Sequence, residues 1–212
     1  VISGIDNMPE GFIADKTIDG DNLLAIPGLI NAHTHSYMSF MRNVADDLSF
    51  MDWLFGKIDP IEQKMTDEDA YWGASLAIME MMKSGTTCFS DMQMNIGMTT
   101  RAVKESGMRA VISRGLVGSI NDDNVMKRID EALKEKEMFK DCDRITFFLG
   151  PHAPYTCEEG YLKLVGETAK KYGMPLHMHL SESLSEIEGC KKDIPHGRGG
   201  YCCRCWYCER NH

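Results

Sequence analysis

The sequence lacks the features that would place the protein in a membrane or on nucleic acid. No hydrophobic run among its 212 residues is long enough to cross a bilayer. Its first residues, VISGIDNMPEG, have neither the basic start nor the apolar centre of a secretory signal, and they include no initiating Met, so we expect the natural start to lie upstream. The net charge is −9 with no basic stripe, so binding to a phosphate backbone is not expected.

Cysteines are scarce over most of the chain and crowded near its end. Four are spread singly, at Cys88, Cys142, Cys157 and Cys190. This spacing is typical of reduced cysteines in the cytoplasm, where we expect the protein. The other four lie within CCRCWYC, residues 202–208, where the spacing is irregular for a zinc ribbon. Hydrophobic residues make up 43% of the chain, which favours a folded globular protein.

Strand and helix signals alternate through the middle of the chain. Five apolar segments indicate strands, at residues 23–30, 86–91, 108–118, 144–150 and 174–183. Helices are indicated between them, over residues 66–84, 99–106, 122–140 and 156–172, with capping-box patterns at Thr66 and Thr156. This order is typical of an α/β fold with a parallel sheet. The long segment 36–65 is expected to form a loop over the carboxyl edge of that sheet.

Polar residues gather where the predicted strands end. They are His33, His35, Asp91, Arg114, His152, His177, His179 and Glu182. Because residues two apart in a strand point to the same side, the two imidazoles of an H-x-H sequence would leave the strand together. Neutral imidazoles that converge on one point are a natural start of a metal site. The alternative for H-x-H alone is two polar residues in a loop.

Five motifs, in this order, resemble one family. PGLINAHTH, RNVADDLSFMDWL, SGTTCFSDM, GPHAPYTC and LHMHLSES together are similar to the amidohydrolase superfamily over about residues 20–190. They are most similar to its 5-methylthioadenosine/S-adenosylhomocysteine deaminase branch, which includes 5′-deoxyadenosine deaminases. The resemblance implies a TIM (β/α)8 barrel with Zn²⁺, or alternatively Fe²⁺, at its carboxyl mouth. It also implies hydrolytic deamination of an adenosine-type nucleoside with release of ammonia.

The resemblance carries a metal and a proton-transfer role onto particular residues. His33 and His35 match the first two metal ligands, and His179 matches the third. Chemistry alone leaves the choice between His177 and His179 open, and the alternative of a core histidine fits His177 better. Glu182 matches a carboxylate that contacts the substrate and moves a proton to the purine ring nitrogen, which requires a raised pKa.

Other residues match substrate contacts of the family. Glu62 matches the acid that binds the ribose hydroxyls, although a solvated carboxylate at a helix start is the alternative. Arg114 and His152 match positions that contact the substrate. Phe50 and Trp53 are expected to line the aromatic side of the pocket, with core packing as the alternative for each.

Two other sequence motifs of zinc enzymes are absent from the sequence. Cytidine-type enzymes carry H-x-E followed by P-C-x-x-C, and the nearest form here is His179-x-x-Glu182. The metalloprotease sequence H-E-x-x-H is missing as well. Both of these alternatives are therefore disfavoured.

The sequence departs from the family pattern near its end. The family requires a histidine after a sixth strand and an aspartate after an eighth, and neither is found in context, since Asp193, His196 and His212 follow no strand signal. A full barrel typically needs about 250 residues. We therefore predict an incomplete barrel of about five of the eight βα units over residues 27–192, with residues 1–26 as a remnant of a small flanking β-domain.

Segment 193–212 changes abruptly in composition. We interpret it as a frame-shifted or non-native end; a genuine cysteine-rich metal knuckle and a natural fragment that completes a barrel in trans are the alternatives. An incomplete barrel would expose strand edges, so aggregation is expected and the fragment is expected to be inactive alone. Within enzymes, the rivals are a guanine deaminase or a triazine chlorohydrolase. Outside enzymes, the rival is a non-catalytic metal-binding or interaction fragment. The expected partner is a small-molecule nucleoside, and a homo-oligomer is allowed.

Overall fold

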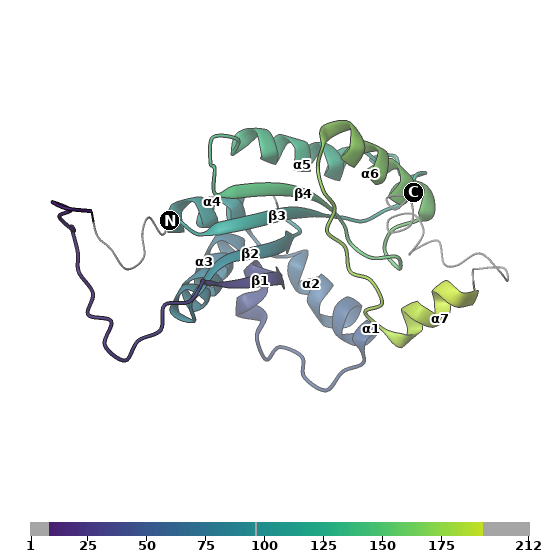
Figure 1. Cartoon of the computed structure of the whole chain (residues 1–212). Coiled ribbons are helices and arrows are strands. Elements are labelled where there is room, and N and C mark those ends of the chain that lie inside the picture. The colour runs from purple at the N-terminus through teal and green to yellow at the C-terminus, as the bar shows by residue number, and fades with distance from the viewer. Residues whose placement is uncertain (1–8, 96, 193–212) are drawn as a thin grey trace.

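A computed structural model describes residues 9–95 and 97–192 of the chain (Figure 1). Its strands are β1 (Leu29–Thr34), β2 (Thr86–Gln93), β3 (Arg109–Leu116) and β4 (Ile145–Pro151). Its α-helices are α1 (Phe50–Trp53), α2 (Asp59–Glu62), α3 (Asp67–Lys83), α4 (Met98–Ser106), α5 (Lys127–Met138), α6 (Glu159–Tyr172) and α7 (Leu184–Lys192). A 3₁₀-helix, η1 (Ser36–Met41), follows β1, and a π-helical turn, η2 (Leu54–Ile58), joins α1 to α2.

The strands form one parallel sheet in the order β1-β2-β3-β4. Helices connect each strand to the next, so the predicted parallel α/β arrangement is confirmed (Figure 1). All strands of this sheet run in the same direction, and their carboxyl ends therefore meet at one edge. His35, the end of β2 and the residues after β4 lie at that edge.

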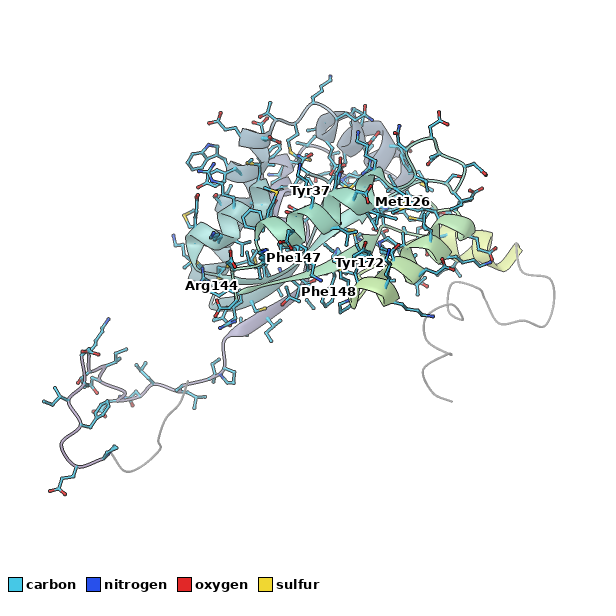
Figure 2. All side chains as sticks on the ribbon, turned by 90° about the horizontal axis from the view of Figure 1, so that it is seen from above. Tyr37, Met126, Arg144, Phe147, Phe148 and Tyr172 are labelled. Carbon is cyan, nitrogen blue, oxygen red and sulfur yellow. The ribbon has the colours of Figure 1, made fainter. Side chains whose placement is uncertain are left out.

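The two faces of the sheet differ in what covers them. One face carries Phe89, Ile112 and Phe147, which are buried in a core cluster with side chains of the helices. Successive residues of a strand point to opposite sides. Phe148, next to Phe147 on β4, is therefore on the other face, and it is only half-buried (Figure 2). That second face also carries Ser113, which the register pairs with Phe148.

The first strand begins later than predicted. The sequence indicated residues 23–30, whereas β1 spans Leu29–Thr34. The strand can start only where a neighbour offers hydrogen bonds, and β2 begins at Thr86. The amide of Leu29 donates to the carbonyl of Gly85 at 3.0 Å, which is the start of the pairing.

The predicted fifth strand, 174–183, was wrong as a regular strand. The segment lies beside β4 through a single bridge between Leu149 and Leu176. The amide of His177 donates to the carbonyl of Leu149. The next amide on the same side of the segment, that of His179, donates to the carbonyl of His152 at 2.9 Å and not to that of Pro151. A proline has no amide hydrogen, so Pro151 cannot continue the ladder. The described residues therefore contain four strands rather than five.

The helix starts were predicted with mixed success. The capping box of Thr66 and Asp69 at the start of α3 is confirmed. The helix predicted from residue 122 begins at Lys127, because the Asp122 carboxylate accepts from the amide of Ser119 at 2.7 Å and closes a turn instead. The capping box predicted at Thr156 was wrong, since α6 has Glu158 as its N-cap residue.

The flanking segments add little to the sheet. Residues 9–28 contain no helix or strand and extend away from the sheet (Figure 1). Their assignment to a small flanking β-domain stays a prediction, as do the other domain boundaries. Segment 193–212, with its cysteine cluster, lies outside the described residues. Within residues 9–192, apart from residue 96, no helix has the length and apolar character needed to span a membrane.

A buried carboxylate joins α5 to the end of β2. Glu135 is 1% exposed and accepts hydrogen bonds from the side chains of Gln93 and Thr100 and from the amide of Gly97. Burial raises the pKa of Glu135, although these three hydrogen bonds act in the opposite direction. The carboxylate thus ties the loop after β2 to a helix on the outer face of the sheet.

Replacing Glu135 should therefore destabilise the fold strongly. In Glu135→Ala, three buried donors lose their acceptor, and we expect the free energy of unfolding to fall by about 3 kcal/mol. Urea unfolding followed by circular dichroism measures the change. Glu137→Ala, on the same helix but with an exposed side chain, is the matched control and should change little. Equal midpoints for the two variants would contradict this assignment.

Candidate metal centre

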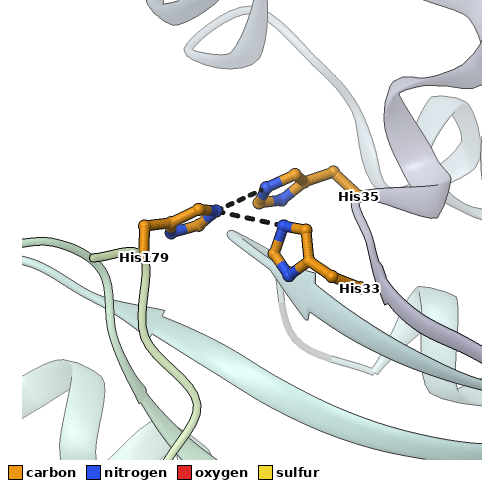
Figure 3. A group of neighbouring side chains, drawn as sticks. All are labelled: His33, His35 and His179. Carbon is orange, nitrogen blue, oxygen red and sulfur yellow. Dashed lines mark hydrogen bonds between the residues drawn. The ribbon is translucent and has the colours of Figure 1, made fainter. Parts of the chain in front are cut away.

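Three imidazoles converge at the carboxyl edge of the sheet (Figure 3). His33 is in β1, His35 follows it, and His179 comes from the segment beside β4. The Nε2 atom of His179 lies 3.1 Å from Nε2 of His35 and 3.1 Å from Nε2 of His33. The ligand atoms of all three lie within 4.8 Å of one another. The structure therefore brings together the three histidines predicted as metal ligands.

Backbone carbonyls orient two of these rings. Nδ1 of His35 lies 2.8 Å from the carbonyl oxygen of Met92, at the end of β2. Nδ1 of His179 lies 2.9 Å from the carbonyl oxygen of His152. A carbonyl can only accept, so each Nδ1 carries the hydrogen and each Nε2 of a neutral ring keeps a lone pair. Both lone pairs are directed at the shared point.

This donor set fits a divalent cation better than it fits hydrogen bonds among the rings. Burial, followed by the nearby His179, lowers the pKa of His35 to about 3, so this ring is neutral near pH 7. A cation between two facing lone pairs stabilises them. Nitrogens bound at about 2.1 Å in a tetrahedral zinc site lie about 3.4 Å apart. The observed 3.1 Å separations are close to that spacing.

A buried carboxylate holds the turn after the H-x-H sequence. Asp91 is fully buried in β2 and accepts from the amide of Ser36 at 2.7 Å and from its hydroxyl at 2.9 Å. Burial raises the pKa of Asp91 to about 7, against these two hydrogen bonds. Ser36 follows His35 directly. The two hydrogen bonds from Ser36 to Asp91 and the contact with the Met92 carbonyl therefore fix the position of the His35 ring together.

The predicted catalytic carboxylate is Glu182, whose charge reaches one of the three histidines. Glu182 accepts a hydrogen bond from the Tyr155 hydroxyl at 2.8 Å, and its charge acts on the pKa of His33. The backbone around it is held by Glu186, which is 6% exposed and accepts from the amides of Ser181 and Glu182, each at 2.9 Å. Tyr155 and Glu186 were not singled out from the sequence, although Tyr155 lies in the same motif as His152 and Glu186 follows the LHMHLSES motif.

The predicted ribose-binding acid, Glu62, is linked to the histidines by Tyr37. The hydroxyl of Tyr37 donates to Glu62, and the Tyr37 ring lies 6.4 Å from the ring of His35. Burial raises the pKa of Glu62, while the hydrogen bond from Tyr37 lowers it. A carboxylate in this environment differs from the solvated helix-start carboxylate that was the alternative.

Arg114 lies in β3, where its charge acts on the pKa of Glu62, and His152 follows β4, where its charge acts on the pKa of His35. Arg114 is 8% exposed, and its Nη2 contacts Glu131 at 2.9 Å. Its Nε and Nη1 are buried without a hydrogen-bond partner among the described residues. His152 lies with its ring centre 4.8 Å from that of His179, and its Nδ1 lies 2.9 Å from the Thr156 hydroxyl. The Thr156 hydroxyl also donates to the carbonyl of Ala153, so it is engaged in the turn that precedes α6.

The two aromatic residues expected near the pocket lie in α1, and both are half-buried. The ring of Phe50 lies 5.8 Å from that of Tyr155, which also contacts His152, whereas Trp53 packs against Phe50 at 6.0 Å. His177 does not fit the core interpretation. It is half-buried, and its Nε2 lies 2.8 Å from Nδ1 of His33.

The fold and the site together define part of a parallel β/α barrel with histidines grouped at its carboxyl edge. The model of the amidohydrolase family matches residues 24–202, and the chain belongs to this family. The predicted resemblance and the predicted incomplete barrel are thus confirmed.

Individual relatives agree with this assignment. The chain is 46% identical over 184 residues to a 5-methylthioadenosine/S-adenosylhomocysteine deaminase from Pelotomaculum thermopropionicum, covering 86% of this chain and 42% of that protein. It is 45% identical over 179 residues to a 5′-deoxyadenosine deaminase from Methanocaldococcus jannaschii, covering 84% and 43%. It matches the crystal structure of an adenosine deaminase from Xanthomonas campestris with bound zinc at a TM-score of 0.70 and 31% identity, covering 79% of this chain and 39% of that one. The chain therefore spans less than half the length of these relatives.

Buried histidines make the stability of the metal-free protein depend on pH. Burial, followed by the nearby His179, lowers the pKa of His152 to about 4, below its value of about 6.5 in an unfolded chain. Between these two pH values the unfolded chain binds more protons. The contribution of His152 to stability is therefore complete above pH 6.5 and is lost as the pH falls towards 4.

We expect the difference in unfolding free energy between the wild type and His152→Gln to fall on acidification, by up to about 1.4 kcal/mol per pH unit between pH 6.5 and 4. Urea unfolding at a series of pH values, with a chelator present, measures this difference, in which the effects of groups that do not interact with His152 cancel. Above pH 7 the difference should be constant, which serves as the internal control. A difference that stays flat down to pH 4 would show that His152 is not held neutral.

Proposed function

We propose that the chain forms the metal-binding part of a hydrolytic deaminase that acts on adenosine-type nucleosides and releases ammonia. The observation that carries the proposal is the convergence of three imidazole Nε2 atoms at the carboxyl edge of the sheet, with the charge of Glu182 acting on one of them, His33. Relatives more than 40% identical are named for 5-methylthioadenosine, S-adenosylhomocysteine or 5′-deoxyadenosine, which supports this substrate class.

His33, His35 and His179 would hold the metal, with Zn²⁺ as our first choice and Fe²⁺ as the alternative. Imidazole nitrogens suit both ions, and a similar solved structure contains zinc. When bound, such an ion lowers the pKa of a coordinated water and makes a nucleophile available near neutral pH. The protein contributes by orienting the rings, through carbonyl acceptors for Nδ1 of His35 and of His179.

Glu182 is the proposed proton carrier. Attack on the carbon that bears the exocyclic amine builds negative charge on the neighbouring ring nitrogen, and a carboxyl group there can supply the proton. The Tyr155 hydroxyl donates to one oxygen of Glu182 and fixes its direction, and Glu186 fixes its backbone. The other oxygen of the carboxylate is left for the substrate.

The remaining residues are proposed to bind the nucleoside. Glu62, oriented by Tyr37, is placed to accept from the ribose hydroxyls. The buried Nε and Nη1 of Arg114 have no partner among the described residues, which favours a polar group of a ligand as their acceptor. His152 lies against His179 and is proposed to contact the base.

We place the protein in the cytoplasm, with a small nucleoside as its partner. Cys88, Cys142 and Cys157 are free in the structure, as expected in a reducing compartment. Leu29 and Ile30 on the outer edge of β1 are 54% and 74% exposed. Such an edge can be covered by another polypeptide, which allows a homo-oligomer.

Metal binding tests the proposed centre directly. The four cysteines of segment 202–208 are first changed to serine in the full chain, so that their thiols cannot bind the ion. We expect this variant to bind one Zn²⁺ or Co²⁺ per chain, and His35→Ala or His179→Ala to weaken binding by more than about 100-fold. Isothermal titration calorimetry measures both quantities. Metal binding that disappears with the cysteines, and is untouched by the histidine variants, would favour the knuckle instead.

A ligand panel tests the substrate class. We expect the zinc-loaded chain to bind 5-methylthioadenosine, S-adenosylhomocysteine or 5′-deoxyadenosine more tightly than guanine, and Glu62→Gln to weaken the nucleosides but not guanine, which has no ribose. Calorimetry measures the affinities. Because the fragment is expected to be inactive alone, an ammonia assay of the zinc-loaded chain should detect no more release than from the His35→Ala variant. Preferential binding of guanine, or of a chlorotriazine, would redirect the proposal to the corresponding relatives.

A further inference from the structure

We propose that His177 is a positioning residue that fixes the tautomer of His33 and thereby directs its Nε2 lone pair to the metal. The inference rests on the metal centre proposed above and deepens it. The proposal is based on a series of contacts that runs from the backbone of β2 through Ser113 and His177 to His33.

His33 differs from the other two converging histidines. The Nδ1 atoms of His35 and His179 face carbonyl oxygens, which alone decide where the ring hydrogen sits. Nδ1 of His33 instead lies 2.8 Å from Nε2 of His177, and the two ring centres are 4.9 Å apart at an angle of 81°. Since an imidazole nitrogen can donate or accept, this contact alone leaves the tautomer of His33 undecided.

The other nitrogen of His177 points at the sheet. Its Nδ1 lies 2.9 Å from the hydroxyl of Ser113 in β3, and that hydroxyl also lies 2.9 Å from the carbonyl oxygen of Asp91. Ser90, in β2, approaches the same Nδ1 only to 3.5 Å, beyond the usual range of a hydrogen bond. The amide of His177 donates to the carbonyl of Leu149, which fixes the backbone of His177 beside β4.

Counting protons decides the direction of every bond in this line. The Ser113 hydroxyl has one hydrogen and two neighbours, and the Asp91 carbonyl can only accept it. For both contacts to be hydrogen bonds, the hydroxyl must donate to Asp91 and accept from Nδ1 of His177. Nε2 of a neutral His177 is then an acceptor, so Nδ1 of His33 must carry the hydrogen.

The hydrogen on Nδ1 of His33 decides the state of its Nε2 atom, which faces the proposed metal position. With its hydrogen on Nδ1, its Nε2 keeps a lone pair, and that atom lies 3.1 Å from Nε2 of His179. All three converging rings then present lone pairs to one point. In the reverse arrangement, Nε2 of His33 would carry a hydrogen and could not bind a cation. A metal ligand commonly has its other ring nitrogen fixed in this way by a neighbour.

A direct role of His177 as a ligand does not fit the geometry. His177 contacts the Nδ1 atom of His33, whereas His179 contacts the Nε2 atom of His33. These two nitrogens of His33 point in different directions from its ring. Among the described residues, the group whose ligand atoms converge is His33, His35 and His179, without His177.

The tautomer can be measured without any metal. Long-range ¹H–¹⁵N correlation spectra of the full, metal-free chain, in the variant lacking the four cysteines of segment 202–208, separate rings protonated on Nδ1 from rings protonated on Nε2. We expect His33, identified by its loss in His33→Gln, to be protonated on Nδ1 in the parent protein. In His177→Phe, which keeps a ring but has no acceptor, we expect a mixture of the two forms and a Co²⁺ affinity lower by about 10- to 100-fold.

Two further variants separate positioning from a general loss of structure. In His177→Gln the side-chain oxygen can accept from His33, so both the tautomer and most of the Co²⁺ affinity should return. Ser113→Ala should shift the tautomer of His33, because Nδ1 of His177 loses its acceptor. Ser90→Ala, on a neighbouring strand and 3.5 Å from the same atom, is the matched control and should change neither quantity.

Several outcomes would overturn the inference. They are a His33 ring protonated on Nε2 in the parent protein, a His177→Phe variant with unchanged tautomer and affinity, and a loss of Co²⁺ binding in both His177 variants as large as in His35→Ala, which would make His177 a ligand. If the parent chain binds no metal, the proposed function fails, but the spectra still decide whether His177 sets the tautomer of His33.

Discussion

The parallel hydrogen-bond register of the sheet is the constraint on which the candidate site depends. It brings the end of β1 beside the end of β2, so that His35 meets the carbonyl of Met92 and Ser36 meets the carboxylate of Asp91. The same edge receives the segment after α6, whose His179 bonds to the carbonyl of His152. A shift of one residue in any of these pairings would turn the side chains to the other face of the sheet.

Backbone carbonyls and buried carboxylates, rather than large apolar side chains, hold the loops at this edge. The carbonyls orient imidazoles by accepting from Nδ1, and they leave Nε2 free for a cation. Asp91, Glu135 and Glu186 each accept at least two hydrogen bonds from a neighbouring loop or helix. Burying a carboxylate is unfavourable unless such bonds are made. These groups therefore fix the loops in one arrangement, and removing Asp91 or Glu135 leaves buried donors without a partner.

The incomplete barrel gives the site an open side. His33 is exposed, and so are Leu29 and Ile30 on the edge of β1 that pairs with no other described strand. The adenosine deaminase structure that resembles this chain continues over more than half of its length beyond the matched part. The three imidazoles nevertheless come together within the described residues, because β1 and the segment after α6 bring them to one edge. Metal binding and complete catalysis are accordingly separate questions for this chain, and the first is proposed for His33, His35 and His179.

The features that the sequence determined by itself are those set by neighbouring residues. The H-x-H spacing places His33 and His35 at one strand end because side chains alternate along a strand, and Thr66 caps α3 through contacts within three positions. The motifs also identified the family. The tertiary structure decided what depends on contacts between distant segments. Pro151 ends the ladder that would have made 174–183 a strand, and His177 meets His33 across 144 positions of the chain. These contacts follow from the register of the sheet, which no local pattern specifies.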